Sequence, residues 1–198
     1  TKSCYNFYKQ NQEIIMKSFL LLIVTLLSTQ IFAAELNGVT HPETVEVAGK
    51  KLILNGIATR KATWIKVKVY VGGFYMEKKS SDYKTFLKDT SPKKIIMTFV
   101  RNVDASDLID GWKEAFGNAV PKEMHPKLQD RMNKFYSYFG DMEKKQSMEF
   151  NFLEDGLETT INGVKKDKIK GFDFSSALLS VWFVNAKDEG LKEGLLGL

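Results

Sequence analysis

The sequence has no apolar stretch as long as a membrane-spanning helix requires. Its apolar run Phe19–Leu27 is far shorter than the roughly 20 residues that such a helix needs. Met16-Lys17 precedes this run and the small residue Ala33 follows it, which is the order of parts in a secretory signal. We therefore expect a periplasmic or secreted protein with no stable membrane anchor after signal cleavage. The expected division of the chain is upstream residues 1–15, a signal peptide over 16–33 and a single domain over 34–198.

Cysteine is missing from the expected domain, because the one cysteine of the chain is Cys4. A disulfide, a thiol nucleophile and a cysteine metal ligand are therefore excluded there. Histidine is scarce as well: His41 and His125 each precede a proline, which favours surface positions in a turn or at a helix start. Neither a G-x-S-x-G nor an H-E-x-x-H motif occurs. The sequence thus predicts no nucleophilic hydrolase, no metal and no cofactor.

An excess of one charge is also limited. Loss of residues 1–33 removes three lysines and one glutamate, so the formal net charge falls from +5 to +3. This excess is too small, and too interleaved with acidic residues, to indicate nucleic-acid binding. Lysine pairs at the expected ends of elements are most simply solvated edges that resist strand aggregation, while a membrane-surface role stays open. The pairs are 50–51, 78–79, 93–94, 144–145 and 165–166.

Hydrophobic periodicity divides the expected domain into strands and helices. Alternating apolar residues predict strands over 45–47, 52–54, 63–76, 94–103, 148–152 and 157–161, with a hairpin around Gly49-Lys50 that leads to Asn55-Gly56. Helical spacing predicts helices over 80–88, 104–120, 126–139 and from 173 onward, with Ser80 or Ser81, Asp104 and Asp173 as N-caps. Strands first, helices between them and strands again indicate an α+β fold, with helices on one face of an antiparallel sheet.

The strand expected over 64–76 has two partly apolar faces. One face carries Val67, Val69, Val71 and Tyr75, and the other carries Lys66, Lys68, Tyr70, Gly72 and Phe74. Gly72-Gly73 lies inside the strand, which favours a bulge or a close backbone approach over a phosphate loop. The room beside Gly72 is within reach of Arg60, and a guanidinium at the mouth of an apolar space suits an anionic head with an apolar tail. The alternative is a surface arginine beside a hairpin.

Four segments of the chain resemble the bacterial chalcone isomerase-like family. They are NGIATRKATWIKVKVYVGGFYM, FVRNVDASDLIDGW, INGVKKDKIKGFDFSSALLSVWF and the tail LKEGLLGL, and together they cover nearly all of the expected domain in order. The most specific parts are the arginine ahead of a K-V-Y-x-x-x-x-Y strand and the D-F-x-x-A-L-L-x-x-W helix. The resemblance implies an open-faced β-sandwich, in which a large antiparallel sheet is backed by a layer of helices.

The resemblance also implies a function for Arg60. Plant chalcone isomerases use an arginine at this strand, a threonine further along it, and a tyrosine and an asparagine on the following helix. Arg60 matches the arginine and Tyr70 takes the place of the threonine, but the helix offers no tyrosine and Asn118 lies too far along to substitute. Related proteins of this fold without the enzyme activity resemble fatty-acid-binding proteins, in which arginine and tyrosine hold the carboxylate.

Three functions follow from these observations. The leading one is an exported, non-catalytic binder of fatty acids or similar amphipathic carboxylates, in which Arg60 and Tyr70 hold the carboxylate and Phe74 contacts the tail. The second is an isomerase or intramolecular lyase that acts on a phenolic or enone substrate through Arg60. The third is an interaction scaffold without a pocket. A cavity that reaches Arg60 favours the first two, whereas an Arg60 ion pair beside a filled core favours the third.

Overall fold

The computed structural model describes residues 33–62 and 65–198. The expected upstream residues and nearly all of the expected signal peptide, up to residue 32, lie outside the described residues. An eight-stranded antiparallel sheet forms the centre of the described domain, in the order β10-β8-β7-β6-β5-β4-β3, with β9 paired to β8. Its strands are β3 (Thr44–Val47), β4 (Lys50–Ala62), β5 (Val67–Met76), β6 (Lys93–Phe99), β7 (Ser147–Leu153), β8 (Gly156–Ile161), β9 (Val164–Lys165) and β10 (Ile169–Lys170).

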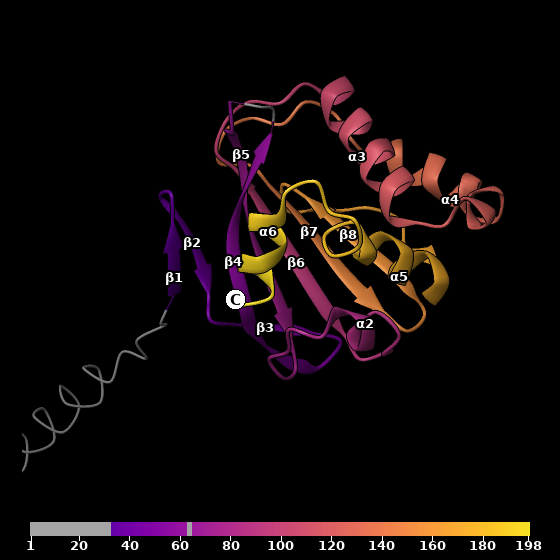
Figure 1. The fold of residues 1–198 in the computed structure, drawn as a ribbon, viewed down its shortest axis with the longest axis horizontal. Helices are drawn as coiled ribbons and strands as arrows, with labels where there is room; N and C mark the ends of the chain where they lie inside the picture. Colours follow the sequence, from indigo (N-terminus) through magenta and orange to yellow (C-terminus); the bar gives the residue numbers. More distant parts are fainter. Residues whose placement is uncertain (1–32, 63–64) are drawn as a thin grey trace, which may run out of the picture. The chain divides into compact units, whose positions relative to one another are not determined.

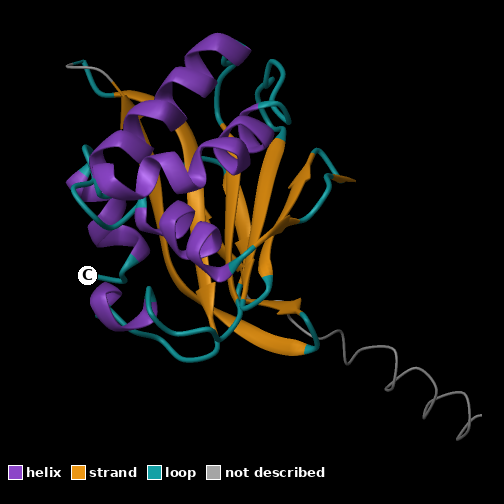
Figure 2. Ribbon diagram, turned by 90° about the vertical axis from the view of Figure 1, so that its right-hand side faces the viewer, coloured by secondary structure: helices purple, strands orange, loops and turns teal. Residues whose placement is uncertain are grey.

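Helices cover one face of this sheet, as the purple and orange layers of Figure 2 show. They are α2 (Tyr83–Phe86), α3 (Ala105–Ala119), the 3₁₀ turn η1 (Lys122–Met124), α4 (His125–Tyr136), α5 (Phe172–Ser180) and α6 (Glu189–Leu195). A separate two-stranded hairpin, β1 (Ala33–Leu36) with β2 (Val39–Pro42), precedes the sheet. The expected α+β architecture, a large antiparallel sheet backed by helices, is confirmed. Among the described residues, none of the helices has the length and apolar character needed to cross a membrane.

The main core lies between the sheet and the helices. Apolar residues of alternating strand positions meet the inward faces of α3, α4 and α5, where aromatic rings pack edge to face. Trp112 of α3 is at the centre of this packing, with its ring 5.2 Å from Phe135 and 5.4 Å from Trp182 between centroids. A smaller cluster on the opposite face of the sheet contains Tyr75, Val47 and Leu52. The two clusters explain why β5 is apolar on both faces.

The hairpin expected around Gly49-Lys50 joins β3 to β4. Strand β4 does not end near Asn55-Gly56 but continues through these residues to Ala62. Helix α6 lies across β4 here, as Figure 1 shows, and the Asn55 side-chain amide donates a hydrogen bond of 2.8 Å to the carbonyl of Leu195. A Cβ atom on Gly56 would lie 2.1 Å from the carbonyl oxygen of Gly194. The glycine therefore serves a close helix–strand contact, and β4 runs on until it pairs with the whole of β5.

Two of the expected helix caps also differ. Asp82 caps α2, because its carboxylate accepts hydrogen bonds from the backbone and the hydroxyl of Thr85, while Ser80 accepts from the amide of Asp82. Helix α5 starts after Gly171, so Asp173 is not its N-cap. The Asp173 carboxylate forms an ion pair with Arg131 of α4. Asp104 occupies the N-cap of α3 as expected, although its side chain makes no capping hydrogen bond.

His41 is buried, contrary to the surface position expected from the proline that follows it. It lies on β2 with about 1% of its surface exposed, and a Cβ atom on Gly73 would come within 2.8 Å of its Nδ1. The close approach expected at Gly72-Gly73 is thus to a histidine ring. Burial lowers the pKa of His41. His125 does start a helix, α4, and its Nε2 lies 2.9 Å from the carbonyl oxygen of Val120.

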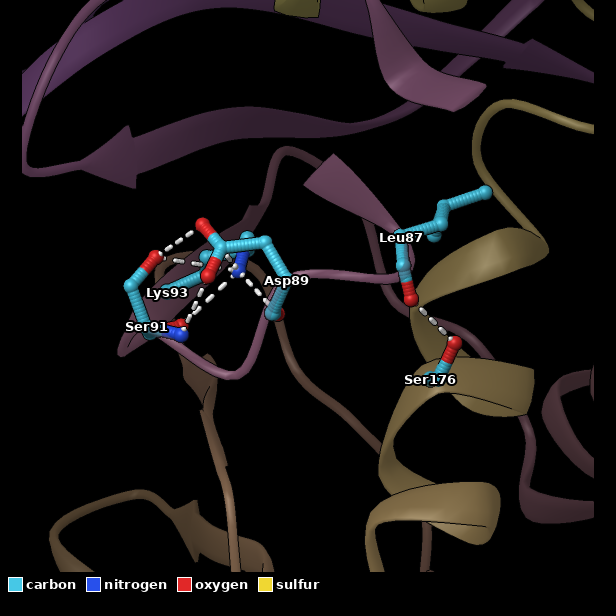
Figure 3. A network of polar contacts seen from close by, with 5 residues as sticks. All are labelled: Leu87, Asp89, Ser91, Lys93 and Ser176. Atoms are coloured by element: carbon cyan, nitrogen blue, oxygen red, sulfur yellow. Dashed lines mark hydrogen bonds and ion pairs between the residues drawn. The ribbon is translucent and has the colours of Figure 1, made fainter. Parts of the chain in front are cut away.

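The lysine pair at 93–94 is buried rather than solvated. Figure 3 shows the Lys93 ammonium inside the loop that leads into β6, where it donates hydrogen bonds of 2.8 Å to the carbonyls of Asp89 and Ser91. Lys94 forms an ion pair with Glu149 on the neighbouring strand β7. Nearby, the Ser176 hydroxyl donates a 2.6 Å hydrogen bond to the Leu87 carbonyl and fastens α5 to the same loop. Both lysines are thus held by polar contacts at the end of the sheet where α2 lies, and burial lowers the pKa of Lys93.

Candidate functional site

Arg60 and Tyr70 are direct neighbours in the sheet. Arg60 on β4 pairs with Tyr70 on β5, which in turn pairs with Phe99 on β6. The next pair along is Lys61 with Lys68, so Val69 has no partner on β4 and forms a bulge. A bulge changes the direction in which side chains point. As a result Val69, expected on the face opposite Tyr70, lies beside it on the cavity side.

These residues border a cavity of about 440 Å³. Its floor is the end of β4, β5 and β6, its roof is α3, and its third side is the segment between α5 and α6. This volume lies within the range of small-molecule sites, which are mostly apolar with a few placed polar groups. Its lining includes Arg60, Tyr70, Phe99, Leu108, Trp112 and Trp182.

Tyr70 presents a neutral hydroxyl at the cavity wall. Its side chain is largely buried, its ring lies 6.0 Å from that of Phe99, and its oxygen accepts a 3.1 Å hydrogen bond from Trp182 Nε1. Burial raises the pKa of Tyr70 to about 12, although the Arg60 cation and the Trp182 hydrogen bond act in the opposite direction. Because Trp182 donates to the phenol oxygen, the proton of Tyr70 stays free to be donated to a ligand.

Arg60 has one ion-pair partner within the described residues. Its Nη1 lies 3.3 Å from Asp188 Oδ2 and also donates to the carbonyl of Lys61. The Arg60 side chain is 26% exposed and that of Asp188 is 13% exposed. Every guanidinium hydrogen bond between residues that the structure describes starts from Nη1. Nε and Nη2 make no hydrogen bond among the described residues, so their donors are not used by this part of the fold.

Asp188 is held in place by more than Arg60. Its Oδ2 accepts a 2.6 Å hydrogen bond from the amide of Lys61, and its Oδ1 accepts one of 3.1 Å from the amide of Leu191 at the start of α6. Asp188 is thus the N-cap of α6 and links that helix to β4. The carboxylate would keep these two contacts if Arg60 turned toward a ligand.

Phe74 does not line the cavity. It is fully buried in the helix-facing core, with ring centroids 5.2 Å from both Phe86 and Phe183. The alternation of β5 places Phe74 on the same side as Tyr70, but four residues of strand separate them by about 13 Å. The large apolar side chains that line the cavity are therefore others.

They come from β6, from α3 and from the segment after α5, namely Phe99, Leu108, Trp112 and Trp182. The helical spacing had identified the last three as inward-facing, and that spacing alone does not separate residues that fill a core from those that border a cavity. Asn118 also lines the cavity. The sequence places it near the end of α3, further along than the asparagine of the plant enzymes. Helix α3 carries no tyrosine. Arg60, Tyr70 and Asn118 share the lining with other polar and charged residues, namely Arg101, Asn102, Asp104, Asp107, Glu114, Asn185, Lys187 and Asp188.

The chain belongs to the chalcone isomerase-like family, whose model matches residues 33–197. Among solved structures, the domain is similar to a fatty-acid binding protein of Arabidopsis thaliana. The similarity has a TM-score of 0.69 at 13% sequence identity and covers 83% of this chain and 96% of the plant chain. At this identity the likeness concerns the fold. No curated protein matches the sequence.

Proposed function

We propose that this protein is an exported, non-catalytic binder of long-chain fatty acids or similar amphipathic carboxylates. The observation that carries the proposal is the cavity, which has Arg60 and Tyr70 side by side in one wall and large apolar side chains in the others. The family membership and the structural likeness to a fatty-acid binding protein support the same ligand class.

The carboxylate would lie between Arg60 and Tyr70. Arg60 would donate from Nη2 and Nε, in paired charge-assisted hydrogen bonds, and Tyr70 would donate a single hydrogen bond from its hydroxyl. The tail would lie against Leu108, Trp112 and Phe99, whose apolar surface leaves water when the ligand binds. A ligand with a charged head and an apolar body thus fits both parts of the cavity.

Calorimetric titration with a long-chain fatty acid and its matching alcohol tests the proposal. The two ligands share the tail, so their difference reports the contribution of the charged head. We expect the acid to bind at least tenfold more tightly, on the order of the 1.5–3 kcal/mol of a hydrogen bond to a charged group. If neither ligand binds, the Arg60–Asp188 ion pair has only a structural role, and the scaffold function replaces the binder.

Asn118 supports a second candidate, an isomerase or intramolecular lyase that acts on a phenolic or enone substrate. Its presence with Arg60 and Tyr70 around one cavity gives three polar groups that could orient such a substrate. The tyrosine of the plant enzymes has no counterpart on α3, so we expect no cyclisation of chalcone above the uncatalysed rate. Stopped-flow absorbance measures this rate. Turnover that disappears in Arg60→Ala would replace the binder with the enzyme.

Export of the protein rests on the signal-like pattern of residues 16–33. We expect the secreted protein to begin near Ala34. N-terminal sequencing of material from the periplasm or the culture medium measures this directly. A chain that still begins at Met16 or earlier would contradict export.

A further inference from the structure

A second hollow, of about 460 Å³, lies at the same end of the sheet as the cavity. It is bordered by the β1–β2 turn, by the ends of β5 and β6, and by the segment that precedes β7. Phe99 borders both spaces. Three lysines line the hollow, Lys68, Lys144 and Lys145, and its lining contains no acidic residue. The hollow is therefore a positively charged surface next to the cavity.

More cations surround this hollow. We call the basic end the six exposed side chains Lys61, Lys66, Lys68, Arg101, Lys144 and Lys145. Acidic side chains begin outside the hollow, at Glu143, at Asp104 on the cavity side and at Asp188, which accepts a hydrogen bond from the Lys61 amide. The basic end is thus a local feature of one end of the sheet and does not reflect the modest net charge of the chain.

Backbone contacts bring these cations together from three segments. Lys61 and Lys68 are direct partners across β4 and β5. The amide of Lys145 donates a 2.8 Å hydrogen bond to the carbonyl of Phe99, and that of Lys144 donates one of 2.9 Å to the Asn102 side chain. These bonds fix the lysine pair to the end of β6, beside Arg101.

No described ion pair offsets the repulsion between these cations. Like charges directly opposite each other on neighbouring strands destabilise a sheet, and Lys61 faces Lys68 in this way. None of the ion pairs between residues 33–62 and 65–198 includes a member of the basic end. Lys68 donates only to the neutral amide of Asn37 in the described hydrogen bonds. The unfavourable grouping points to an anionic partner outside the chain.

An exposed apolar residue identifies the kind of partner. Ile65 lies in the turn between β4 and β5, next to Lys66, and is 59% exposed. Cations that flank an exposed apolar side chain match an anionic bilayer, where lysines meet lipid headgroups and the apolar group enters the interface. We propose that the basic end docks the protein on anionic lipid bilayers, with the Ile65 turn inserted among the headgroups.

Vesicle co-sedimentation of the full chain tests this docking without any fatty acid, so it is independent of the proposed ligand. The test variant is Lys144→Glu with Lys145→Glu, and the matched control is Lys78→Glu with Lys79→Glu. The control lysines are also exposed but lie beyond the opposite end of β5. Both variants change the net charge equally and keep residues 1–32, so a difference between them reports the position of the charge.

On vesicles rich in phosphatidylglycerol, we expect the test variant to bind at least about tenfold more weakly than the control, since each lysine near an anionic surface contributes about fivefold. Binding should fall as salt rises from about 0.05 to 0.5 M, because salt screens the charges. Ile65→Ser should weaken binding without changing this salt dependence. Neutral phosphatidylcholine vesicles should show no difference between the variants.

Two results would overturn the proposal. Equal loss of binding in both double variants would mean that only the net charge matters. Binding to duplex DNA that depends on Lys144 and Lys145, with no such dependence on anionic vesicles, would assign the basic end to nucleic acid instead. Circular dichroism of each variant separates these outcomes from a loss of folding.

Discussion

Two arginines of this domain are almost equally exposed and yet are used differently. Arg131 on α4 is 25% exposed and Arg60 on β4 is 26% exposed. Arg131 makes a two-pronged pair with Asp173, with Nη1 2.7 Å from Oδ1 and Nη2 2.9 Å from Oδ2. Arg60 makes a single contact of 3.3 Å with Asp188, from Nη1. Exposure therefore does not distinguish the two, but hydrogen-bond geometry does.

The difference indicates which arginine serves the fold and which is open to a ligand. Both terminal nitrogens of Arg131 are engaged with Asp173, and further bonds reach the carbonyls of Lys170 and Lys127. Its guanidinium also lies 5.7 Å from the centre of the Phe174 ring, which ties α4 to α5. Arg60 instead borders a cavity and keeps donors on Nε and Nη2.

The largest effect should come from Arg60→Ala, and it should concern binding rather than stability. We expect the affinity for a long-chain fatty acid to fall by roughly 2–5 kcal/mol, the cost of truncating one member of a buried charged pair. Isothermal titration calorimetry measures the loss. The affinity for the matching alcohol should change much less, because the alcohol has no charge to lose.

Arg60→Met is the control for this variant, because arginine also contributes packing through its aliphatic stem. Methionine fills similar space without charge, so it should lose the preference for acid over alcohol as alanine does. If Arg60→Met kept that preference, the carboxylate would not be held by the guanidinium.

Arg131→Ala should do the opposite. Loss of a two-pronged, partly exposed pair should lower the free energy of unfolding by about 1–3 kcal/mol. Urea denaturation followed by circular dichroism measures this change. Fatty-acid affinity of the folded variant should equal that of the wild type, and a matching loss of affinity would erase the distinction between the two arginines.

The contribution of Asp173 to the free energy of unfolding should depend on pH. Hydrogen bonds from Arg131 hold the pKa of Asp173 well below its ordinary value of 3.8. Below that ordinary pKa the Asp173 carboxyl is protonated in the unfolded chain but still ionised in the folded chain. The contribution of Asp173 to the free energy of unfolding is therefore present above about pH 4 and declines as the pH falls further. Urea denaturation between about pH 5 and 2 should show a shallower decline in Asp173→Asn than in the wild type. Parallel declines would contradict the role of this pair.

Tyr70→Phe should weaken acid binding by only about 0.5–1.5 kcal/mol, the net contribution of a neutral hydrogen bond. The variant keeps the ring and its packing against Phe99 but leaves Trp182 Nε1 without its acceptor. Part of the effect should therefore appear as lower stability, which thermal unfolding measures without ligand. An affinity equal to that of the wild type would remove Tyr70 from the carboxylate site.

The smallest effect is a gain. Asp188→Asn removes the anion that competes for Arg60 but keeps a good N-cap for α6. We expect acid binding to strengthen by about 0.2–1 kcal/mol, the value of a partly exposed ion pair. Calorimetry with acid and alcohol measures it, and an equal gain for both ligands would show that charge is not its cause.

The sequence predicted what depends on local pattern. Alternation gave the strands on either side of Arg60, and the resemblance brought Arg60 and Tyr70 to one site. Contacts between segments that are far apart in the chain could not be predicted from such patterns. Strand β4 continues through Asn55-Gly56, where it contacts α6 some 140 residues later, and this contact leaves no local signal. The bulge at Val69 appears only when the register of β4 and β5 is known.

The same limit applies to the cavity and to the buried lysines. Phe74 shares a face with Tyr70 but packs against rings of α2 and the segment after α5, which strand alternation cannot place. The lysine pair predicts an exposed charge at Lys93, but the loop from Asp89 to Ser91 covers its ammonium group. Whether an inward-facing tryptophan fills a core or borders a cavity depends on the spacing between layers.

A crystal structure of the protein with a long-chain fatty acid would locate the bound carboxylate directly. We expect the carboxylate within hydrogen-bond distance of Arg60 Nη2 and the Tyr70 hydroxyl, with the tail along Leu108 and Trp112 and with Asp188 still capping α6. A fatty acid bound elsewhere, with Arg60 unchanged beside Asp188, would contradict this expectation.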